Sequence, residues 1–431
     1  MKYLFSALIL LFVAASAFSQ KLSKNEKKIL KSIESNNTEA IEFLKKVVNI
    51  NSGTLNLEGV KEVGMAFKAG FDAIKFDTEW IPMPAEINRA GHFFAETKGN
   101  KGKKLLLIGH LDTVFEKDSP FQEFKMINDS TAHAPGGNDM KGGNVIVLYA
   151  LKALRENGLL NDAQIIVAYT GDEESSGSPL EISRRDLIAA AKRSDIALGF
   201  ETSTGFNYAT VARRGSSGWA LEVEGKRAHS AGVFNERVGA GAIFEVARIL
   251  NDFYEEVKGE QYLTFNPGVL MGGTFVEYDP KTSGGTAFGK TNVVAQKAIV
   301  KGGLRFISED QKENTRAKMR AIVEKHLPQT SAKITFTDSY PAMAPTAGNQ
   351  ALLNKLNQVS IDLGQGTVKG YDPGKRGAAD VSFVAEYVDC LDGLGTMGSG
   401  AHTPEETVNL NTIEALTKRT AILIYRLINE K

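Results

Sequence analysis

Three apolar runs in the sequence end in histidine or acidic residues, the side chains that bind metals and move protons. The run in "LLLIGHLDTV" ends in His110 and Asp112, which would share one face of a strand because alternate residues do. The segment "TGDEESSG" holds the adjacent Glu173 and Glu174 after a second run, and Glu201 follows a third in "SDIALGFETST". Imidazole and carboxylate groups are zinc ligands and serve as general acids or bases. Metal-assisted hydrolysis is one chemistry that these residues could perform.

A fourth candidate, Asp139, stands in the glycine-rich segment "GGNDMKGG" before a predicted helix. Its glycines allow the backbone to approach a ligand closely. Each candidate also has an ordinary explanation: a buried structural histidine for His110, a helix N-cap for Asp139, and a solvated turn for the glutamate pair. For all four segments to have only an ordinary explanation, four independent coincidences would be needed. We therefore expect the segments to meet at the strand ends of an open α/β sheet, where ligands bind.

Strands and helices alternate around these segments. Short apolar runs at 103–111 and 162–171 enclose a segment of helical length that begins at Gly142. The order strand, helix, strand predicts an α/β fold with a mostly parallel sheet and flanking helices. Two helices are predicted over 25–50, separated by a polar break at 36–38, and a later helix is predicted from Asn349.

A segment with a different pattern interrupts this alternation. From Arg214 the sequence alternates apolar and polar residues, becomes helical over 240–257, and then alternates again through "GGLRFIS". We predict a catalytic domain formed by residues 20–213 and 339–431. Residues 214–338 are predicted to form an inserted α+β lid and dimerisation domain.

The first 19 residues have the pattern of a cleaved signal peptide. A single lysine precedes an apolar run over 4–15, and the small-x-small site at 17–19 predicts cleavage after Ser19. The run is shorter than the about 20 apolar residues that span a bilayer. We expect an exported protein, either periplasmic or secreted.

Composition excludes several classes of protein and of metal site. Lys plus Arg and Asp plus Glu both total 51, so the chain lacks the positive excess typical of nucleic-acid binding. Cys390 is the only cysteine, which excludes an intramolecular disulfide and a cysteine-based metal cluster. A bound metal would therefore use histidine and carboxylate ligands.

Two glycine motifs match nucleotide-binding patterns. Residues 284–291, "GGTAFGKT", fit the phosphate-binding loop of nucleotide hydrolases, but that loop needs a following helix and "NVVAQKAIV" has the texture of a strand. Residues 393–398 fit G-x-G-x-x-G, yet no strand–helix–strand unit follows so close to the C-terminus. We predict that the protein binds no nucleotide.

The second glycine motif, in "GLGTMGSGAHTPEE", has a different interpretation. Its glycines are expected to lie against substrate, with Gly398 close to it, and to form a flexible approach to His402. Glu405 and Glu406 are expected to open the final helix, where carboxylates suit the N-terminal dipole.

Taken together, the motifs resemble one enzyme family. From about residue 25 to the end, the chain is similar to the aminoacylase and glutamate carboxypeptidase family of two-zinc peptidases, and the segments that carry the resemblance are "GHLDTV", "GGNDMKGG", "GDEESSG", "GFETST", "RAHSAGV", "TNVV", "LRF" and "GSGAHTPEE". The resemblance implies two zinc ions per subunit. The residues that it implies as ligands are Asp139 as the bridge, His110 and Glu201 at one ion, and Glu174 and His402 at the other.

The resemblance also implies catalytic and substrate-binding residues. Glu173 would be the general base. Asp112 is expected to orient a catalytic group or to support the site because it shares a strand face with His110. His229 and Asn292 would reach the active site from the inserted domain, His229 from the partner subunit of a homodimer. For the substrate carboxylate, the candidates are Arg305 and, as a second choice that is equally explained as a surface charge, Arg376. His133 stands where family members often carry glycine, and its role stays open.

The function implied is that of an exported zinc-dependent carboxypeptidase, similar to glutamate carboxypeptidase. It would hydrolyse the amide bond to the C-terminal amino acid of a small peptide through a metal-bridged water. An N-acyl amino acid deacylase, a dipeptidase or an aminopeptidase of the same fold is the alternative, because the metal core is common to all. A non-catalytic binding protein is an alternative from another class, for which loss of a ligand or of the base would be the sign.

Overall fold

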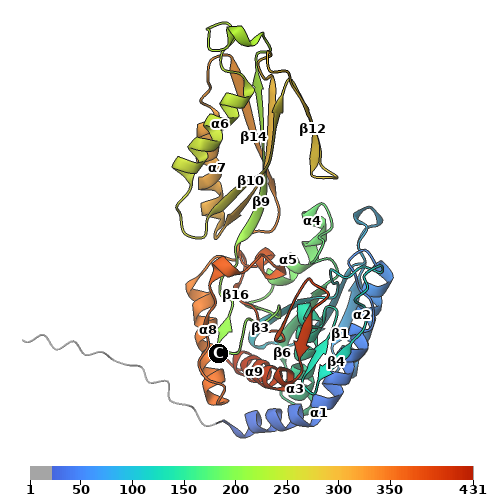
Figure 1. Cartoon of the computed structure of the whole chain (residues 1–431). Helices are drawn as coiled ribbons and strands as arrows, with labels where there is room; N and C mark the ends of the chain where they lie inside the picture. The colour runs from blue at the N-terminus through green and yellow to red at the C-terminus, as the bar shows by residue number, and fades with distance from the viewer. Residues whose placement is uncertain (1–21, 431) are drawn as a thin grey trace, which may run out of the picture.

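The central sheet has six strands in the order β1-β2-β6-β3-β7-β16 (Figure 1). The structure is a computed structural model that describes residues 22–430, so the predicted signal peptide lies outside the described residues. The parallel strands are β3 (Lys101–His110), β6 (Ala163–Thr170), β7 (Ile196–Gly199) and β16 (Asp389–Leu391). The antiparallel strands β1 (Asp77–Ile81) and β2 (His92–Thr97) form one edge. The predicted α/β fold with a mostly parallel sheet is confirmed.

Strand register brings the candidate residues to one edge of the sheet. His110, the last residue of β3, pairs with Thr170, the last residue of β6, and Ile108 pairs with Gly199 at the end of β7. The segments after β6 and β7 therefore leave the sheet beside His110.

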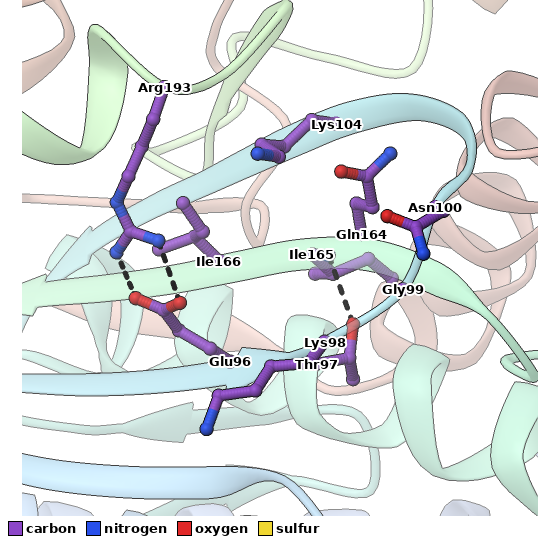
Figure 2. Close-up of a pocket in the computed structure, with 10 residues that line it drawn as sticks. All are labelled: Glu96, Thr97, Lys98, Gly99, Asn100, Lys104, Gln164, Ile165, Ile166 and Arg193. Atoms are coloured by element: carbon purple, nitrogen blue, oxygen red, sulfur yellow. Dashed lines mark hydrogen bonds and ion pairs between the residues drawn. The ribbon is translucent and has the colours of Figure 1, made fainter.

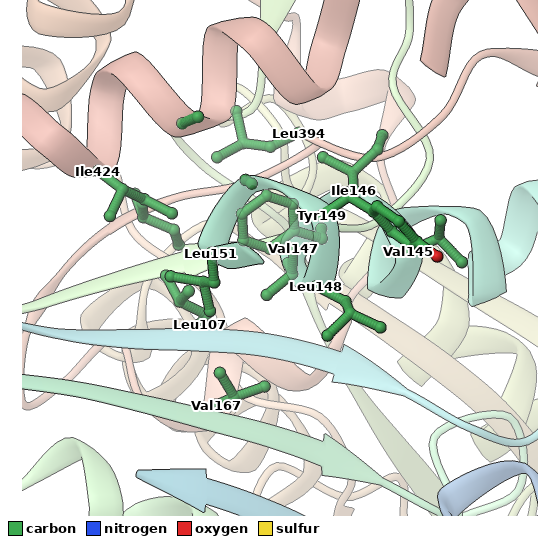
Figure 3. Packing of buried hydrophobic residues seen from close by; sticks show 14 of the residues in the cluster. Leu107, Val145, Ile146, Val147, Leu148, Tyr149, Leu151, Val167, Leu394 and Ile424 are labelled. Atoms are coloured by element: carbon green, nitrogen blue, oxygen red, sulfur yellow. The ribbon is translucent and has the colours of Figure 1, made fainter. Parts of the chain in front are cut away.

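Helices cover both faces of this sheet. On one face Leu105 and Leu107 of β3 belong to the main core with α1 (Lys24–Val48), α2 (Leu57–Ala73), α3 (Gly142–Glu156), α8 (Ala347–Asp362) and α9 (Asn411–Leu427). Figure 3 shows α3 packed over Leu107 and Val167. On the other face, Leu106 and Ile108 share a core with the short helix α5 (Arg185–Ala191), which follows α4 (Leu180–Ser183). Burial of alternate residues on opposite faces explains the continuous apolar runs.

The two helices predicted over 25–50 form one helix, so the predicted break is wrong. Residues 36–38 lie inside α1, because the buried positions Ile29, Ile33, Ala40 and Leu44 continue one apolar face across them. Packing of that face outweighs the low helix propensity of the polar residues. A capping box at Ser23 fixes the start of the helix.

The inserted segment forms a separate antiparallel sheet, seen above the catalytic domain in Figure 1. Its order is β10-β13-β9-β14, with β9 (Gly215–Gly225), β10 (Thr264–Gly273), β13 (Lys297–Phe306) and β14 (Thr330–Asp338). The helices α6 (Ala242–Asp252) and α7 (Glu309–Val323) share its core. This domain therefore has a core of its own.

Neither glycine motif has the geometry of a nucleotide loop. Within 284–291, β12 (Gly284–Phe288) pairs with β11 (Phe275–Asp279) in a hairpin, and the next element in the described chain is β13 rather than a helix. The predicted strand from Asn292 is partly wrong, since residues 292–296 are irregular and β13 begins at Lys297. Between 393 and 410 the described chain contains only short strands. No helix of residues 22–430 is long and apolar enough to cross a membrane.

Candidate metal centre

Histidine and carboxylate groups from five segments converge beside the ends of β3, β6 and β7. His110 Nε2 lies 3.2 Å from Asp139 Oδ1 and 3.6 Å from Glu201 Oε1. On the other side, His402 Nε2 lies 3.0 Å from Asp139 Oδ2 and 3.2 Å from Glu174 Oε2. The two oxygens of Asp139 thus face two different groups, each formed by one histidine and one glutamate.

These groups have the donor set and spacing that a metal requires. Ligand atoms of His110, Asp139 and Glu174 all lie within 4.8 Å of one another, as do those of His110, Glu173 and Glu201. Glu174 Oε1 is buried and has no hydrogen-bond partner. A buried carboxylate oxygen without a partner is destabilising unless a cation or donor compensates it, so the donor set fits metal ions.

Mutual repulsion of the carboxylates is visible in their pKa values. Burial and the charge of Asp139 raise the pKa of Glu201 to about 7, and burial together with Glu201 raises the pKa of Glu173 well above its usual value. Hydrogen bonds with Asp139 and Glu174 raise the pKa of His402 to about 11. The centre therefore carries clustered negative charge that attracts cations.

Asp112 holds His110 and the glutamate loop in place. It is fully buried and accepts hydrogen bonds from Thr54 Oγ1 at 2.7 Å and from the backbone N–H groups of Glu173 and Glu174, both at 3.0 Å. His110 Nδ1 lies 3.0 Å from the Asp112 carbonyl oxygen, which directs Nε2 toward Asp139. These contacts place Asp112 directly behind the candidate metal centre, and its supporting role stays a prediction.

Glu406 has a position that sequence reasoning missed. It was expected to open the final helix, but α9 begins at Asn411, and Glu406 instead precedes the short strand β18 (Thr407–Asn409). Its buried carboxylate accepts hydrogen bonds from the backbone N–H groups of Gly136 at 3.2 Å, Asn138 at 2.9 Å and Asp139 at 3.1 Å. The expectation about the helix is wrong because β18 intervenes.

Comparison with known proteins identifies the family. The sequence profile of peptidase family M20/M25/M40 matches residues 106–426, which is most of the chain. The chain belongs to this family. It is therefore a metallo-hydrolase that acts on peptide or amide bonds, and the predicted resemblance to two-metal peptidases of the glutamate carboxypeptidase type is confirmed.

Relatives of this M20 peptidase differ in what they act on. Carboxypeptidase G2 from Pseudomonas sp. is 27% identical over 425 residues, which cover 96% of this chain and 94% of that protein. Succinyl-diaminopimelate desuccinylase from Gluconobacter oxydans is 24% identical and covers 80% of this chain and 87% of that protein. Among solved structures, aminopeptidase PepT from Bacillus cereus has a TM-score of 0.70 at 17% identity, covering 91% of this chain and 99% of that chain. The solved structure supports the M20 fold.

His229 and Asn292 lie together in the inserted domain of the M20 peptidase. The Ser230 N–H donates to the Asn292 carbonyl at 2.9 Å, and His229 forms a backbone bridge with Val293. Both side chains are exposed. Within residues 22–430, no hydrogen bond or ion pair joins either of them to the metal-centre residues.

The two candidate arginines have different surroundings. Arg305 is an exposed residue of β13. Partial desolvation of its guanidinium and the charge of Arg214 lower its pKa. Arg376 is partly buried, and its buried Nε has no hydrogen-bond partner. Burial and Arg213 lower the pKa of Arg376, whereas Glu201, among other carboxylates, opposes this effect. Arg376 is therefore partly buried, and the carboxylates of the metal centre act on its pKa, while its role stays a prediction.

Gly398 and His133 support the loop that carries His402. Gly398 lies in β17 (Gly398–Ser399), where an added Cβ would stand 1.9 Å from the Thr407 carbonyl oxygen, so glycine is required by close packing. His133 ends β5 (Thr131–His133) and pairs with Thr407 of β18. Its ring contacts Phe121 edge-on, and its buried Nδ1 has no partner. Nothing in the described chain pairs His133 with a candidate ligand.

A separate pocket lies at the opposite end of the central strands (Figure 2). It has a volume of about 340 Å³ and includes Lys104 near the start of β3 and Gln164 near the start of β6. Arg193 closes one side through a two-pronged ion pair with Glu96. The pocket shares no lining residue with the metal centre, so we assign it no part in hydrolysis.

Proposed function

We propose that this M20 peptidase is an exported zinc-dependent carboxypeptidase that releases a C-terminal amino acid, glutamate or another carboxylate-bearing residue, from a small peptide or N-acyl amino acid. The observation that carries the proposal is the position of Asp139 between two histidine–glutamate groups. Similarity to carboxypeptidase G2 over almost the whole chain supports the choice of carboxypeptidase.

In the proposal, two zinc ions are held by five residues: Asp139 between them, His110 and Glu201 on one side, and Glu174 and His402 on the other. When bound, the ions would polarise the scissile carbonyl and lower the pKa of the attacking water. The partnerless oxygen of Glu174 supports its assignment as a ligand.

Glu173 acts in the proposal as the general base. Glu174, rather than Glu173, contacts His402, and the Glu173 carboxylate lies instead beside His110 and Glu201, where it can move a proton. The Glu173 backbone is fixed because its N–H donates to Asp112 and its carbonyl accepts from Tyr340. The carboxylate takes a proton from the attacking water and passes it to the leaving amine.

An arginine binds the terminal carboxylate of the substrate in the proposal, since guanidinium is a planar two-pronged donor. Arg376 is the stronger candidate because it lies within electrostatic reach of Asp139 and Glu201 and has an unpartnered buried Nε. Arg305 and Gly398 remain candidates for contacts farther along the substrate.

We also propose a homodimer formed through the inserted domain, with His229 acting on the centre of the partner subunit. Support comes from exposed apolar side chains around α6 and the edge strand β10, namely Phe234, Ile243, Phe244 and Leu270. A charged residue in place of Phe244 should convert the dimer to a monomer and lower activity together, which sedimentation and assays would measure. A monomeric wild-type enzyme with full activity would contradict this part of the proposal.

A test of substrate class separates the alternatives. The zinc-loaded enzyme is assayed with N-blocked dipeptides ending in glutamate, with N-succinyl amino acids and with free tripeptides. Release of the C-terminal glutamate from blocked dipeptides is expected, and preference for N-succinyl substrates would instead support the deacylase alternative suggested by the desuccinylase relative. Hydrolysis only of substrates with a free amine would support an aminopeptidase. Inactivity on all three would support a binding protein, against which the complete ligand set argues.

Export is tested with the full-length chain. Expression in a bacterium, fractionation and N-terminal sequencing should give a periplasmic or secreted protein that begins at Gln20. A cytoplasmic protein with an intact N-terminus would contradict export.

A further inference from the structure

The two linkers that join the domains are hydrogen-bonded to each other. They run over 210–214 and 339–343, and the Arg213 N–H donates to the Met343 carbonyl at 2.9 Å while the Met343 N–H donates back at 3.1 Å. The Ser216 N–H donates to the Tyr340 carbonyl at 2.8 Å. Because of this pairing, rotation of the inserted domain acts on both linkers together.

The Tyr340 side chain reaches from the second linker to the loop of the proposed base. Its hydroxyl donates to the Glu173 carbonyl at 2.7 Å and lies 2.6 Å from Ser176 Oγ. A phenol has one hydrogen, which the carbonyl must receive, so Ser176 donates to Tyr340. Arg184 Nη2 also donates to the hydroxyl, at 3.3 Å. The hydroxyl therefore joins three groups of the catalytic domain.

Arg184 anchors this hydroxyl in a buried network. Its guanidinium is fully buried and pairs with Asp172 at 2.6 Å and with Asp380 at 2.8 Å. Asp172 directly precedes Glu173 in the chain. Breaking a buried charged network is strongly destabilising, so the catalytic-domain side of these contacts is rigid.

Packing between the domains is looser around the linker itself. A cavity of about 260 Å³ lies between Leu180 and Ile188 of the catalytic domain and Phe306 of the inserted domain. A second cavity, of about 460 Å³, adjoins Pro341. The space between the domains beside this linker is therefore not filled by close packing, while the Tyr340 hydrogen bonds span it.

We propose that Tyr340 is a positioning residue that links the orientation of the inserted domain to the position of Glu173. The proposal rests on the function proposed for Glu173. The backbone of Glu173 is held at both of its polar groups, by Asp112 at the N–H and by Tyr340 at the carbonyl. Since displacement of a catalytic group by about 1 Å can lower a rate about a hundredfold, movement of this linker changes catalysis without any contact with substrate.

The first test replaces only the hydroxyl. Tyr340→Phe keeps the ring that packs on Phe383 at a centroid distance of 4.9 Å. We expect kcat to fall about tenfold, with KM and zinc content unchanged, because one oriented hydrogen bond is lost. Tyr425→Phe is the matched control, since its hydroxyl accepts a hydrogen bond from Asn25 on the far helices and should leave kcat unchanged. An unchanged kcat in Tyr340→Phe would overturn the proposal.

The second test measures domain orientation without any turnover. Cys390 is buried, so spin labels can be placed selectively on cysteines introduced at the exposed positions Asp129 and Lys281, one in each domain. In chelator-treated protein, Tyr340→Phe should broaden the distribution of label distances. A lower kcat with an unchanged distribution would overturn the coupling, because the residue would then act only locally.

Two further outcomes are distinguishable. If Tyr340→Phe does not fold, Ser176→Ala removes one partner of the same hydroxyl. This variant should lower kcat and broaden the distribution of label distances to a smaller extent, and no change in either would overturn the proposal.

If the wild-type enzyme hydrolyses no substrate, the proposed function fails. An unchanged distribution of label distances in Tyr340→Phe overturns the linker coupling independently.

Discussion

Glu406 accepts a hydrogen bond from the backbone N–H of Asp139 at 3.1 Å, although 267 positions separate the two residues in the chain. This contact joins the loop of the proposed bridging ligand to the loop of His402, which lies four residues before Glu406. The two loops are thereby held at a fixed separation. Partners behind metal ligands commonly set metal affinity in this way.

Replacing this carboxylate should therefore weaken metal binding. Glu406→Gln keeps the size of the side chain but presents an NH₂ group to backbone N–H donors, and we expect zinc affinity to fall about 10- to 100-fold. Competition titration with a chromophoric chelator measures the change. Glu405→Gln is the control, because Glu405 is exposed. Equal affinities in the two variants would rule out the positioning role.

Substitutions of the adjacent Glu173 and Glu174 should distinguish the general base from the metal ligand. Glu173→Gln should lower kcat by about 10²- to 10⁴-fold because the proton acceptor is lost, while zinc content stays near that of the wild type. Glu174→Gln should lower zinc content, because a ligand that contacts His402 is neutralised. Metal analysis and steady-state kinetics on both variants measure these effects. Loss of zinc in Glu173→Gln, with zinc retained in Glu174→Gln, would exchange the two assignments.

Zinc binding should release a proton from His402. Hydrogen bonds with Asp139 and Glu174 raise its pKa to about 11, so the imidazole of chelator-treated protein is charged at neutral pH. Because folding raises the pKa of His402, its ion pairs with Asp139 and Glu174 stabilise the metal-free fold fully below the unfolded pKa of about 6.5. This stabilisation is lost as the pH rises through the pKa of His402 in the folded protein. A histidine must be neutral to bind a metal, so zinc displaces this proton and binds more weakly as the pH falls.

Calorimetry in buffers of different ionisation enthalpy counts the protons released. His402→Asn should release fewer protons than the wild type, and His326→Asn, in the inserted domain, should match the wild type. Equal release by all three proteins would show that His402 does not bind the metal.

The capping box of α1 should give a pH-dependent contribution to stability. Burial raises the pKa of Glu26, but hydrogen bonds from Ser23 and Arg426 outweigh it and hold the pKa below its usual 4.5. Because folding lowers the pKa of Glu26, this carboxylate stabilises the fold at pH values above its pKa in the unfolded chain. The stabilisation is lost as the pH falls through the pKa of Glu26 in the folded protein. At pH 7, Glu26→Gln should lower the free energy of unfolding by about 1 kcal/mol.

Urea titrations at pH 7 and at pH 3 would measure this difference, which should shrink at the lower pH. Glu42→Gln, an exposed change on the same helix, should have little effect at either pH. A deficit for Glu26→Gln that is constant with pH would argue against the ion pair as its cause.

The candidate ligands could be predicted because each follows a recognisable feature. His110, Glu173 and Glu201 stand at or just after strands, and the carboxyl ends of parallel strands meet at one edge. Asp139 and His402 lie in glycine-rich loops whose family motifs gave their roles. The order of a short apolar run, a segment of helical length and a second apolar run likewise predicted the mostly parallel sheet.

Other residues depend on contacts that no local pattern reveals. Tyr340 and Glu406 contact the active-site loops across 167 and 267 positions, and neither belongs to a periodic segment. The partial burial of Arg376 was likewise not predictable, because burial of a charged residue in an irregular segment has no signature in sequence. The continuous α1 was missed because tertiary packing, rather than propensity, joins its two halves.

The insertion of one domain within another imposes an order on folding. Residues 214–338 are continuous and have their own core, so this part can complete its structure from a contiguous stretch of chain. In contrast, α9 packs in one core with α1 and α3, and β16 pairs with β7, so the catalytic sheet needs residues from both ends. During synthesis the inserted domain can therefore be finished while its host is still incomplete, and the candidate metal centre forms only after His402 has emerged near the end of the chain.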